Sequence, residues 1–522
     1  MLKKLHGRKL AVCLLGGAMY ALFSAFGWQA EHGGVIWAGG ALLVAALLVW
    51  PIAALLAVLL ERGYTRALRQ EKTFRAGWAF AFMLVCYVPM FCVAFPGSFA
   101  YDVPYQLRQV VTGAYSTHHP LLHTLALGGL LQLGRALGDI NLGAALYTAL
   151  QMALLAGCFA LTCGSIARQS GARAAKRAAV FFALYPLNMV MAVNATKDVL
   201  FGGFFALTLA LLNEMQGRPS RGLTLKIAAC GALAVMLRNN MAYAALVWLA
   251  LLTIGLRKGE KSAALAMLLA LAVGLCGNAA LKRATRAESG DMSEMLSWPI
   301  QQLARARLYD EDRLTDAEKE AIDELMPGEA WACYDPTISD PVKFEFDTQT
   351  FRADVKKYVG VWLSVGKKCA GTYLDATMAL TYPFFYPYRE YRVSGYYVQL
   401  GMSDAYDAGW CDFDPPESRS LFPRVLASLS WRFGAKGAMQ IPVVGCLFNM
   451  GVIVWTMLFF ALREMYWGRW RRFGTALLPV LLWGTFLLGP VMAGRYIYPF
   501  VCALPVLAAR PGRSVKEAAR HG

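Results

Sequence analysis

Long apolar runs constrain this chain more than any other feature of its sequence. Of its 522 residues, 57% are hydrophobic and 16% are charged, whereas soluble domains are roughly a quarter charged. A helix needs about 20 apolar residues to cross the hydrocarbon core of a bilayer. The runs, several of them short for a span, occur at 9–28, 36–60, 77–95, 143–167, 178–193, 199–214, 225–237, 241–256, 263–281, 441–462, 475–491 and 496–509. The sequence therefore predicts an all-α polytopic membrane protein with about twelve transmembrane helices.

The distribution of Lys and Arg sets the expected orientation. With a cytoplasmic N-terminus, the loops that would also be cytoplasmic hold more than half of these residues. Outside the apolar segment 120–137, the short outer loops hold only Arg108, Lys197, Arg238 and Arg495. Positively charged loops remain on the cytoplasmic side of a membrane. The pattern therefore predicts that both termini are cytoplasmic. It also explains the net charge of +17 without a nucleic-acid partner.

Two segments test this orientation. Residues 120–137 are apolar enough for a thirteenth span, but a span there would turn the later basic loops outward. We therefore expect an interfacial or re-entrant helix on the outer side. Residues 225–256 could form one long helix with the same consequence, so we expect instead two helices that turn at 238–240.

Residues 282–440 form a polar insertion that is long enough for a small domain of about 160 residues. It separates an N-terminal transmembrane region (1–281, with an outer loop at 96–142) from a C-terminal one with a cytoplasmic tail (441–522). Counting spans places this domain outside the cell, with an α-rich or mixed fold. Thr315 is expected to cap a helix that ends near Leu325. The aromatic run 381–397 suits either the headgroup layer or a core strand.

The cysteines leave one question open. Most of the twelve lie in apolar runs, where cysteine behaves as a small hydrophobic residue. Cys333, Cys369 and Cys411 lie in the insertion, and one disulfide among them is possible if the insertion is outside the cell. The sequence does not choose the pairing.

The candidate chemistry begins in the loop 96–123, which follows an apolar run. Ionisable groups at such a junction are costly unless they face water, a partner or a substrate. Asp102 is a candidate general base, or alternatively the N-cap of a helix that starts near 103–104. His118 and His119 are candidate substrate contacts, or turn residues, and His123 is expected to be structural. The histidine spacing is compatible with a metal ion, but we do not favour one.

The outer-loop cations lie between short apolar runs. Lys197 precedes Asp198, Arg238 precedes Asn239, and Arg495 precedes Tyr496. Such polar residues can lie below the membrane surface only around water or protein. Arg and Lys hold phosphate oxygens and stabilise the negative charge of a departing phosphate. A carboxylate can take the proton of an attacking hydroxyl. The residue types therefore favour transfer of a group from a phosphate.

Several short motifs together resemble the GT-C superfamily of glycosyltransferases that use polyprenyl-phosphate donors. They are PGSFAYD (96–102), YSTHHPLLH (115–123), KD (197–198), RNN (238–240) and RYIYP (495–499). With SWPIQQLAR (297–305), they are similar more closely to an uncharacterised family of multipass proteins from Gram-positive bacteria with that fold. The two runs before residue 61 and the single obvious acid in the first large outer loop depart from better-studied branches.

The resemblance implies a hexosyl or pentosyl transferase in a bacterial plasma membrane, with an exoplasmic active site. Its donor would be lipid-linked, and its acceptor a cell-wall polymer, a glycolipid or a protein. Asp102 would be the catalytic base, with His118 and His119 beside it, and Lys197, Arg238 and Arg495 would hold the donor phosphate. No cofactor is expected, and a divalent metal is not favoured. The other candidate substrate contacts are Asp198, Asn239, Tyr496, Gln301 and Arg305.

Two other functions remain open at this point. A polysaccharide ligase or polymerase also uses Arg and His in outer loops, but it needs no acidic base in the first loop. A transporter or flippase would favour internal repeats and broken helices at matching positions. The sequence shows no such repeat, and its long outer insertion is atypical of that class.

Overall fold

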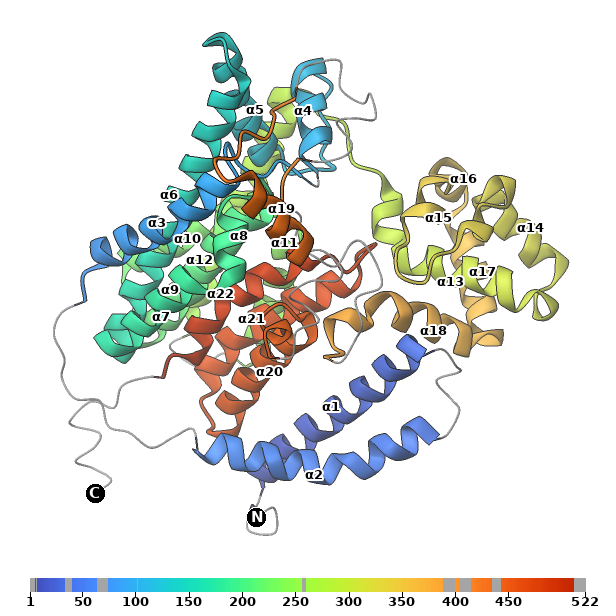
Figure 1. The fold of residues 1–522 in the computed structure, drawn as a ribbon. Coiled ribbons are helices and arrows are strands. Elements are labelled where there is room, and N and C mark those ends of the chain that lie inside the picture. The colour runs from blue at the N-terminus through green and yellow to red at the C-terminus, as the bar shows by residue number, and fades with distance from the viewer. Residues whose placement is uncertain are drawn as a thin grey trace.

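The fold is known from a computed structural model, which describes residues 5, 7–32, 40–62, 74–100, 102–255, 260–387, 400–402, 415–433 and 443–510. These residues are mostly helical (Figure 1), and extended segments pair only at isolated bridges. The prediction of an all-α protein is therefore confirmed for this part of the chain.

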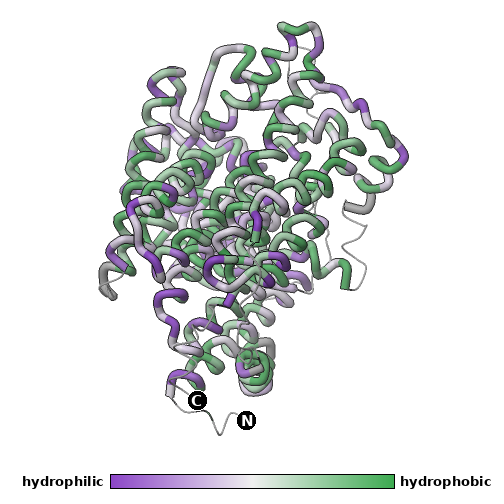
Figure 2. The backbone as a smooth tube through the Cα atoms, turned by 90° about the vertical axis from the view of Figure 1, so that its left-hand side faces the viewer, coloured by the Kyte–Doolittle hydropathy of each residue, from purple (hydrophilic) through white to green (hydrophobic). Residues whose placement is uncertain are grey.

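Among the described residues, six helices are long and apolar enough to cross a membrane. They are α1 (Arg8–His32), α2 (Gly40–Arg62), α3 (Ala76–Val93), α6 (Ile140–Ser170), α9 (Lys197–Gly217) and α12 (Lys261–Thr285). The other predicted runs contain shorter or less apolar helices: α7 (Ala172–Leu184), α8 (Pro186–Ala192), α10 (Arg221–Leu237), α11 (Asn240–Gly255), α20 (Met450–Tyr466), α21 (Trp470–Leu487) and α22 (Tyr498–Ala508). The chain is thus compatible with a multi-pass membrane protein, while the number of twelve spans stays a prediction. Figure 2 shows the long hydrophobic stretches along the helices.

The main core surrounds α9. This helix is buried on nearly all sides and packs against α6, α10 and α22. Gly202 lets the ring of Tyr498 approach, since a Cβ there would lie 3.0 Å from that side chain. By contrast, α2 exposes large side chains such as Leu47 and Trp50. A helix that is apolar on all sides is typical of the interior of a bundle or of a membrane.

Two helix breaks shape the region around the core. The run 178–193 is divided because Pro186 disfavours a helical conformation in the residue before it, and Tyr185 is extended accordingly. The predicted break at 238–240 is present, with Arg238 extended after α10. The two helices then diverge, since α10 packs on α12 and α11 packs on α21.

Two helices that are not among the six candidate spans lie at one end of the molecule (Figure 1). They are α4 (Val103–Thr112) and α5 (Leu121–Ala136), which pack against each other, and α5 also packs on α6. With 16 residues, α5 is shorter than a typical span. Its interfacial or re-entrant position remains a prediction.

The insertion forms a helical lobe beside the main core (Figure 1). The helices of this lobe are η2 (Met292–Leu296), α13 (Ser297–Tyr309), η3 (Glu311–Arg313), α14 (Asp316–Leu325), η4 (Pro327–Cys333), α15 (Asp340–Phe344), α16 (Thr348–Ala353), α17 (Val355–Lys368), α18 (Ala370–Thr381) and η5 (Tyr382–Phe384), whereas α19 (Pro423–Phe433) packs on α3 of the main core. They enclose a second apolar core that includes Ile300, Ile322 and Val365. Thr315 caps α14 as predicted, in a reciprocal capping box with Glu318.

The start of the aromatic run packs into the main core instead of forming a strand or an exposed aromatic face. Tyr382, Phe384 and Phe385 are buried against the main helices, and residues 388–397 lie outside the described residues. Cys333 and Cys369 are free thiols. Cys411 is not among the described residues, so a disulfide with it stays a prediction.

The Thr315 cap offers a test of the insertion. Replacing Thr315 with Ala removes the acceptor for the Glu318 amide and should cost about 1 kcal/mol of local stability. Hydrogen exchange of the amides of 316–325 should become faster in Thr315→Ala. The control Thr315→Ser keeps the hydroxyl and should exchange like the wild type. Equal exchange in all three chains would show that the cap does not stabilise α14.

Candidate functional site

The structure brings five charged side chains from four separate segments into one cluster. Lys197 Nζ lies 2.6 Å from Asp102 Oδ2, and Arg495 Nη2 lies 2.9 Å from Asp102 Oδ1. Arg238 forms an ion pair with Asp198, and Arg495 Nε lies 3.7 Å from the second oxygen of Asp198. Asp102, Lys197, Asp198, Arg238 and Arg495, the ion cluster below, are therefore continuous.

Each member of the ion cluster lies where a helix begins or ends. Asp102 occupies the N-cap position of α4, as the alternative interpretation predicted, but its side chain forms no capping hydrogen bond there. Lys197 and Asp198 form the first turn of α9, where the helix dipole favours a carboxylate. Arg238 lies in the break after α10. Arg495 lies in η10 (Gly494–Ile497), directly before α22.

The ion cluster is largely buried and carries one positive charge in excess. Asp198 is 0% exposed and Asp102 is 21% exposed, while the three cations are mostly covered. The Arg238 guanidinium also stacks on Phe486 and Tyr496, 4.3 and 4.4 Å from the ring centres. Its Nε has no hydrogen-bond partner among the described residues. Burying charge is expensive unless it is paired, so the surplus favours an anionic ligand.

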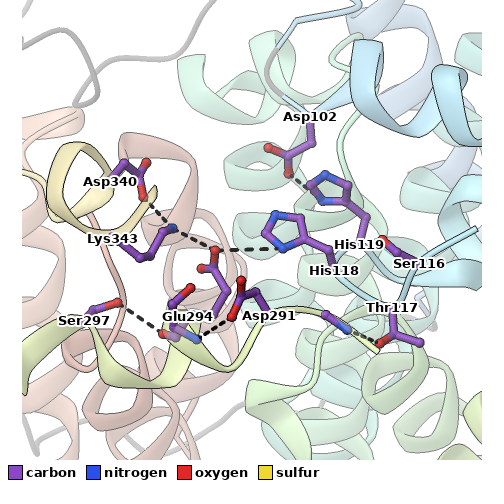
Figure 3. Close-up of polar contacts among 12 residues, drawn as sticks. Asp102, Ser116, Thr117, His118, His119, Asp291, Glu294, Ser297, Asp340 and Lys343 are labelled. Carbon is purple, nitrogen blue, oxygen red and sulfur yellow. Dashed lines mark hydrogen bonds and ion pairs between the residues drawn. The ribbon is translucent and has the colours of Figure 1, made fainter. Parts of the chain in front are cut away.

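The two predicted histidines adjoin Asp102 (Figure 3). His119 Nδ1 lies 3.7 Å from Asp102 Oδ2, and within the described part of the chain this buried nitrogen has no hydrogen-bond partner. His118 packs edge-to-face on His119 and is directed toward Glu294 of the insertion, 3.8 Å from its Oε1. Glu294 was not among the predicted site residues, because a single acid in a polar insertion looks like any solvated side chain.

His123 belongs to a buried polar network behind the site. Its ring contacts Gln106 at 3.1 Å and the Tyr147 hydroxyl at 2.8 Å. That hydroxyl donates to Gln151, whose amide donates to the carbonyl groups of Ala192 and Asn194, just before Lys197. Tyr147 and Gln151 lie four residues apart on one face of an apolar helix, a sequence signal that could have identified them.

Two of the predicted substrate contacts belong to the insertion core and not to the ion cluster. Gln301 donates to the carbonyl groups of Asp335 and Ile338. Arg305 donates to the Tyr334 hydroxyl at 3.1 Å. Gln301 still contributes to the site indirectly. The segment 335–339, to which it donates, pairs with Pro490 and Val491, and these residues lie shortly before Arg495.

The other two predicted contacts, Asn239 and Tyr496, follow site arginines directly. Asn239 is exposed beside Arg238. Tyr496 packs on the guanidinium groups of Arg238 and Arg495.

Opposing effects fix the protonation states around Asp102. Burial raises the pKa of the Asp102 carboxyl, but Arg495 and Lys197 outweigh it and hold this pKa well below its usual range. Burial lowers the pKa of His119 well below its usual range, and the neighbouring Asp102 offsets this only in part. The site therefore holds an ionised carboxylate beside a neutral imidazole at neutral pH. Among the described residues, no group of three potential ligands is arranged to hold a metal ion.

The buried histidines should make the folded protein less stable as the pH falls. Burial lowers the pKa of His123 to about 3, whereas an unfolded histidine titrates near about 6.5. Below that value the unfolded chain binds the extra proton, so stability falls by roughly 1.4 kcal/mol per pH unit and per buried histidine. The thermal midpoint of His123→Gln should therefore fall less than that of the wild type between pH 7.5 and 5.5 (both approximate). The exposed control His32→Gln should follow the wild type, and an equally steep fall in His123→Gln would contradict a buried neutral His123.

Comparison with known proteins identifies a family but no function. No curated protein and no solved structure matches the chain. A family model matches residues 112–521, which include Lys197, Arg238 and Arg495 but begin after Asp102. Because the match covers well over half of the chain, this protein belongs to the family of unknown function DUF6020.

Proposed function

We propose that this protein is an integral-membrane glycosyltransferase that moves a sugar from a polyprenyl-phosphate donor to an exoplasmic hydroxyl group. The observation that carries this proposal is the ion cluster: a partly exposed carboxylate in contact with two cations, and a third cation beside them, with positive charge in surplus. A phosphate supplies the anion that such a cluster lacks. A sugar attached to that phosphate would lie beside the carboxylate.

The donor phosphate would take over bonds that Asp102 makes in the free protein. Lys197 and Arg495 donate to Asp102 at 2.6 and 2.9 Å. Charge-assisted hydrogen bonds to phosphate oxygens are of similar strength, so the exchange keeps both cations paired. Arg238 stays tied to Asp198 and adds its charge from behind.

This exchange also prepares Asp102 to act as a base. In the free protein, its two cations keep its pKa well below the usual range, against the effect of burial, and a carboxylate so stabilised takes up a proton poorly. When the phosphate draws the cations away, burial and the negative phosphate both favour the protonated acid. Donor binding therefore raises the basicity of Asp102 at the moment it is needed.

The transfer step follows from these roles. The oxygen of the acceptor hydroxyl forms a bond to the anomeric carbon of the sugar, and the bond from that carbon to the phosphate oxygen breaks. The electron pair of the broken bond stays on the phosphate, where Lys197, Arg238 and Arg495 stabilise the new charge. The hydroxyl proton passes to Asp102. A neutral His119 helps to orient the hydroxyl from the other side.

A membrane-bound donor explains why such a site lies in a helix bundle. The polyprenyl chain stays in the bilayer, while its phosphate must reach charged groups at the ends of helices such as α9 and α22. Charges at that depth are tolerated only where protein or water surrounds them. The ion cluster meets this condition because its members pair with one another.

The role of Asp102 can be tested with Asp102→Asn in proteoliposomes that contain labelled polyprenyl-phosphate hexoses and a cell-envelope extract as the acceptor source. Losing a general base should lower the transfer rate by at least about 100-fold. The control Asp312→Asn alters an exposed acid of the insertion and should keep full activity. A thermal midpoint close to that of the wild type excludes misfolding. Full activity of Asp102→Asn would refute the base and favour a polysaccharide ligase.

The phosphate-binding role predicts a different pattern for the arginines. Arg495→Ala and Arg238→Ala should raise the apparent KM for the donor by about tenfold or more, the equivalent of one charge-assisted hydrogen bond. The KM for the acceptor should change much less. Arg238→Lys keeps a positive charge beside Asp198, so it shows whether the effect of Arg238→Ala on donor binding is caused by loss of folding. Arg135→Ala, on the exposed face of α5, is the matched control, and an equal rise in both KM values would count against a donor-phosphate site.

A further inference from the structure

The loop that carries His118 is hydrogen-bonded to the beginning of the insertion. The Thr117 amide donates to the Glu288 carbonyl, and the Glu288 amide donates to the Tyr115 carbonyl, both at 2.9 Å. The Gly290 amide donates to the Thr117 hydroxyl at 3.0 Å. A Cβ on Gly290 would lie 3.3 Å from the backbone of His118, so the two segments are in close contact. This pairing fixes His118 relative to η2, the next element of the insertion.

A buried lysine fixes Glu294 on η2. Lys343 is 4% exposed, and its Nζ lies 2.7 Å from Glu294 and 2.6 Å from Asp340 (Figure 3). A buried ammonium group is costly unless it is paired, so this lysine holds the Glu294 side chain in place. Two carboxylates share one lysine, and this side of the site therefore carries a negative charge.

The two carboxylate–imidazole pairs have similar geometry. His118 Nδ1 lies 3.8 Å from Glu294 Oε1, and His119 Nδ1 lies 3.7 Å from Asp102 Oδ2. Both separations exceed a direct hydrogen bond. An oxygen beside each pair, at about 2.8 Å from both atoms, would accept from or donate to each of them. The side chains of His118 and Glu294 are 44% and 29% exposed, and the buried Nδ1 of His119 has no hydrogen-bond partner among the described residues.

We propose that His118 and Glu294 form a subsite for the hydroxyl groups of a carbohydrate acceptor, with the attacking hydroxyl between Asp102 and His119. The role in transfer rests on the proposed function, whereas binding of a carbohydrate does not. A hydroxyl group both donates and accepts, so it matches a carboxylate and an imidazole together. The insertion, through Glu294, then selects the acceptor.

Charge separates this subsite from the place of the donor. A phosphate would be repelled by Glu294 and Asp340, while it is attracted by the cations on the other side of Asp102. A neutral polyol is neither repelled by these carboxylates nor drawn to the cations. Asp102 lies between the two regions, where a base must lie if it is to serve a hydroxyl that attacks a phosphate-linked sugar.

Binding can be measured on the full-length protein in lipid nanodiscs by saturation-transfer NMR. The probes are the methyl glycosides of glucose, galactose and mannose at millimolar concentration. We expect saturation of at least one probe in the wild type and at least a threefold loss in Glu294→Gln and in His118→Ala. Glu288→Gln, on the same segment but with an exposed side chain, should bind like the wild type. His118→Ala, at a more exposed position, decides the matter if Glu294→Gln does not fold. Absent saturation in the wild type, or equal saturation in the folded variants, would overturn the subsite.

Further measurements distinguish a glycolipid from a water-soluble glycan, and they also test the transfer function separately from the acceptor subsite. Tighter binding of the octyl glycosides than of the methyl glycosides indicates a glycolipid acceptor, and equal binding indicates a water-soluble glycan.

With labelled polyprenyl-phosphate hexoses, Glu294→Gln should raise the acceptor KM about tenfold while release of free sugar to water continues. If the wild type binds glycosides but consumes no donor, the transfer function fails and the subsite stands. Donor turnover with an unchanged acceptor KM in Glu294→Gln overturns the subsite alone.

Discussion

The ion pair between Arg238 and Asp198 is the constraint on which this site depends. Asp198 has no exposed surface, and Arg238 is nearly as deeply buried. Neither charge is tolerable there without the other, so the end of α10 and the beginning of α9 must meet. Arg495 approaches the second oxygen of Asp198 and thereby brings the start of α22 to the same point. Three helix ends are thus held together by charge, and Lys197, the neighbour of Asp198, is directed at Asp102.

The charges around Asp102 divide into two regions of opposite sign. Lys197, Arg238 and Arg495 come from the helices of the main core, whereas Glu294 and Asp340, which share Lys343, come from the insertion. The division follows from chain topology, because the beginning of the insertion, which carries Glu294, is joined to the site by its pairing with residues 115–117. A donor held by the membrane and an acceptor held by the insertion would therefore approach Asp102 from different parts of the fold.

Charge and hydropathy in the sequence predicted the helices and the main candidate residues. Asp102, Lys197, Arg238 and Arg495 stood out because ionisable groups are rare beside apolar runs, and the Thr315 cap was readable because capping is local. Glu294 and Lys343 gave no such signal, since their importance arises from contacts across about 50 residues of the insertion and with the His118 loop. Gln301 and Arg305 were assigned to the substrate by motif alone, and they pack instead within the insertion.

If the proposed function holds, the free and donor-bound states of the ion cluster need to differ only in which anion the cations hold. In the free protein Asp102 pairs with both Lys197 and Arg495, which avoids leaving two buried cations unpaired. A phosphate that replaces it satisfies the same donors, so the helices α9 and α22 need not move. The released carboxylate then faces His119, whose buried nitrogen has no hydrogen-bond partner within the described segments. A hydroxyl group between them meets both needs at once, and for that reason donor binding would create the acceptor position next to it.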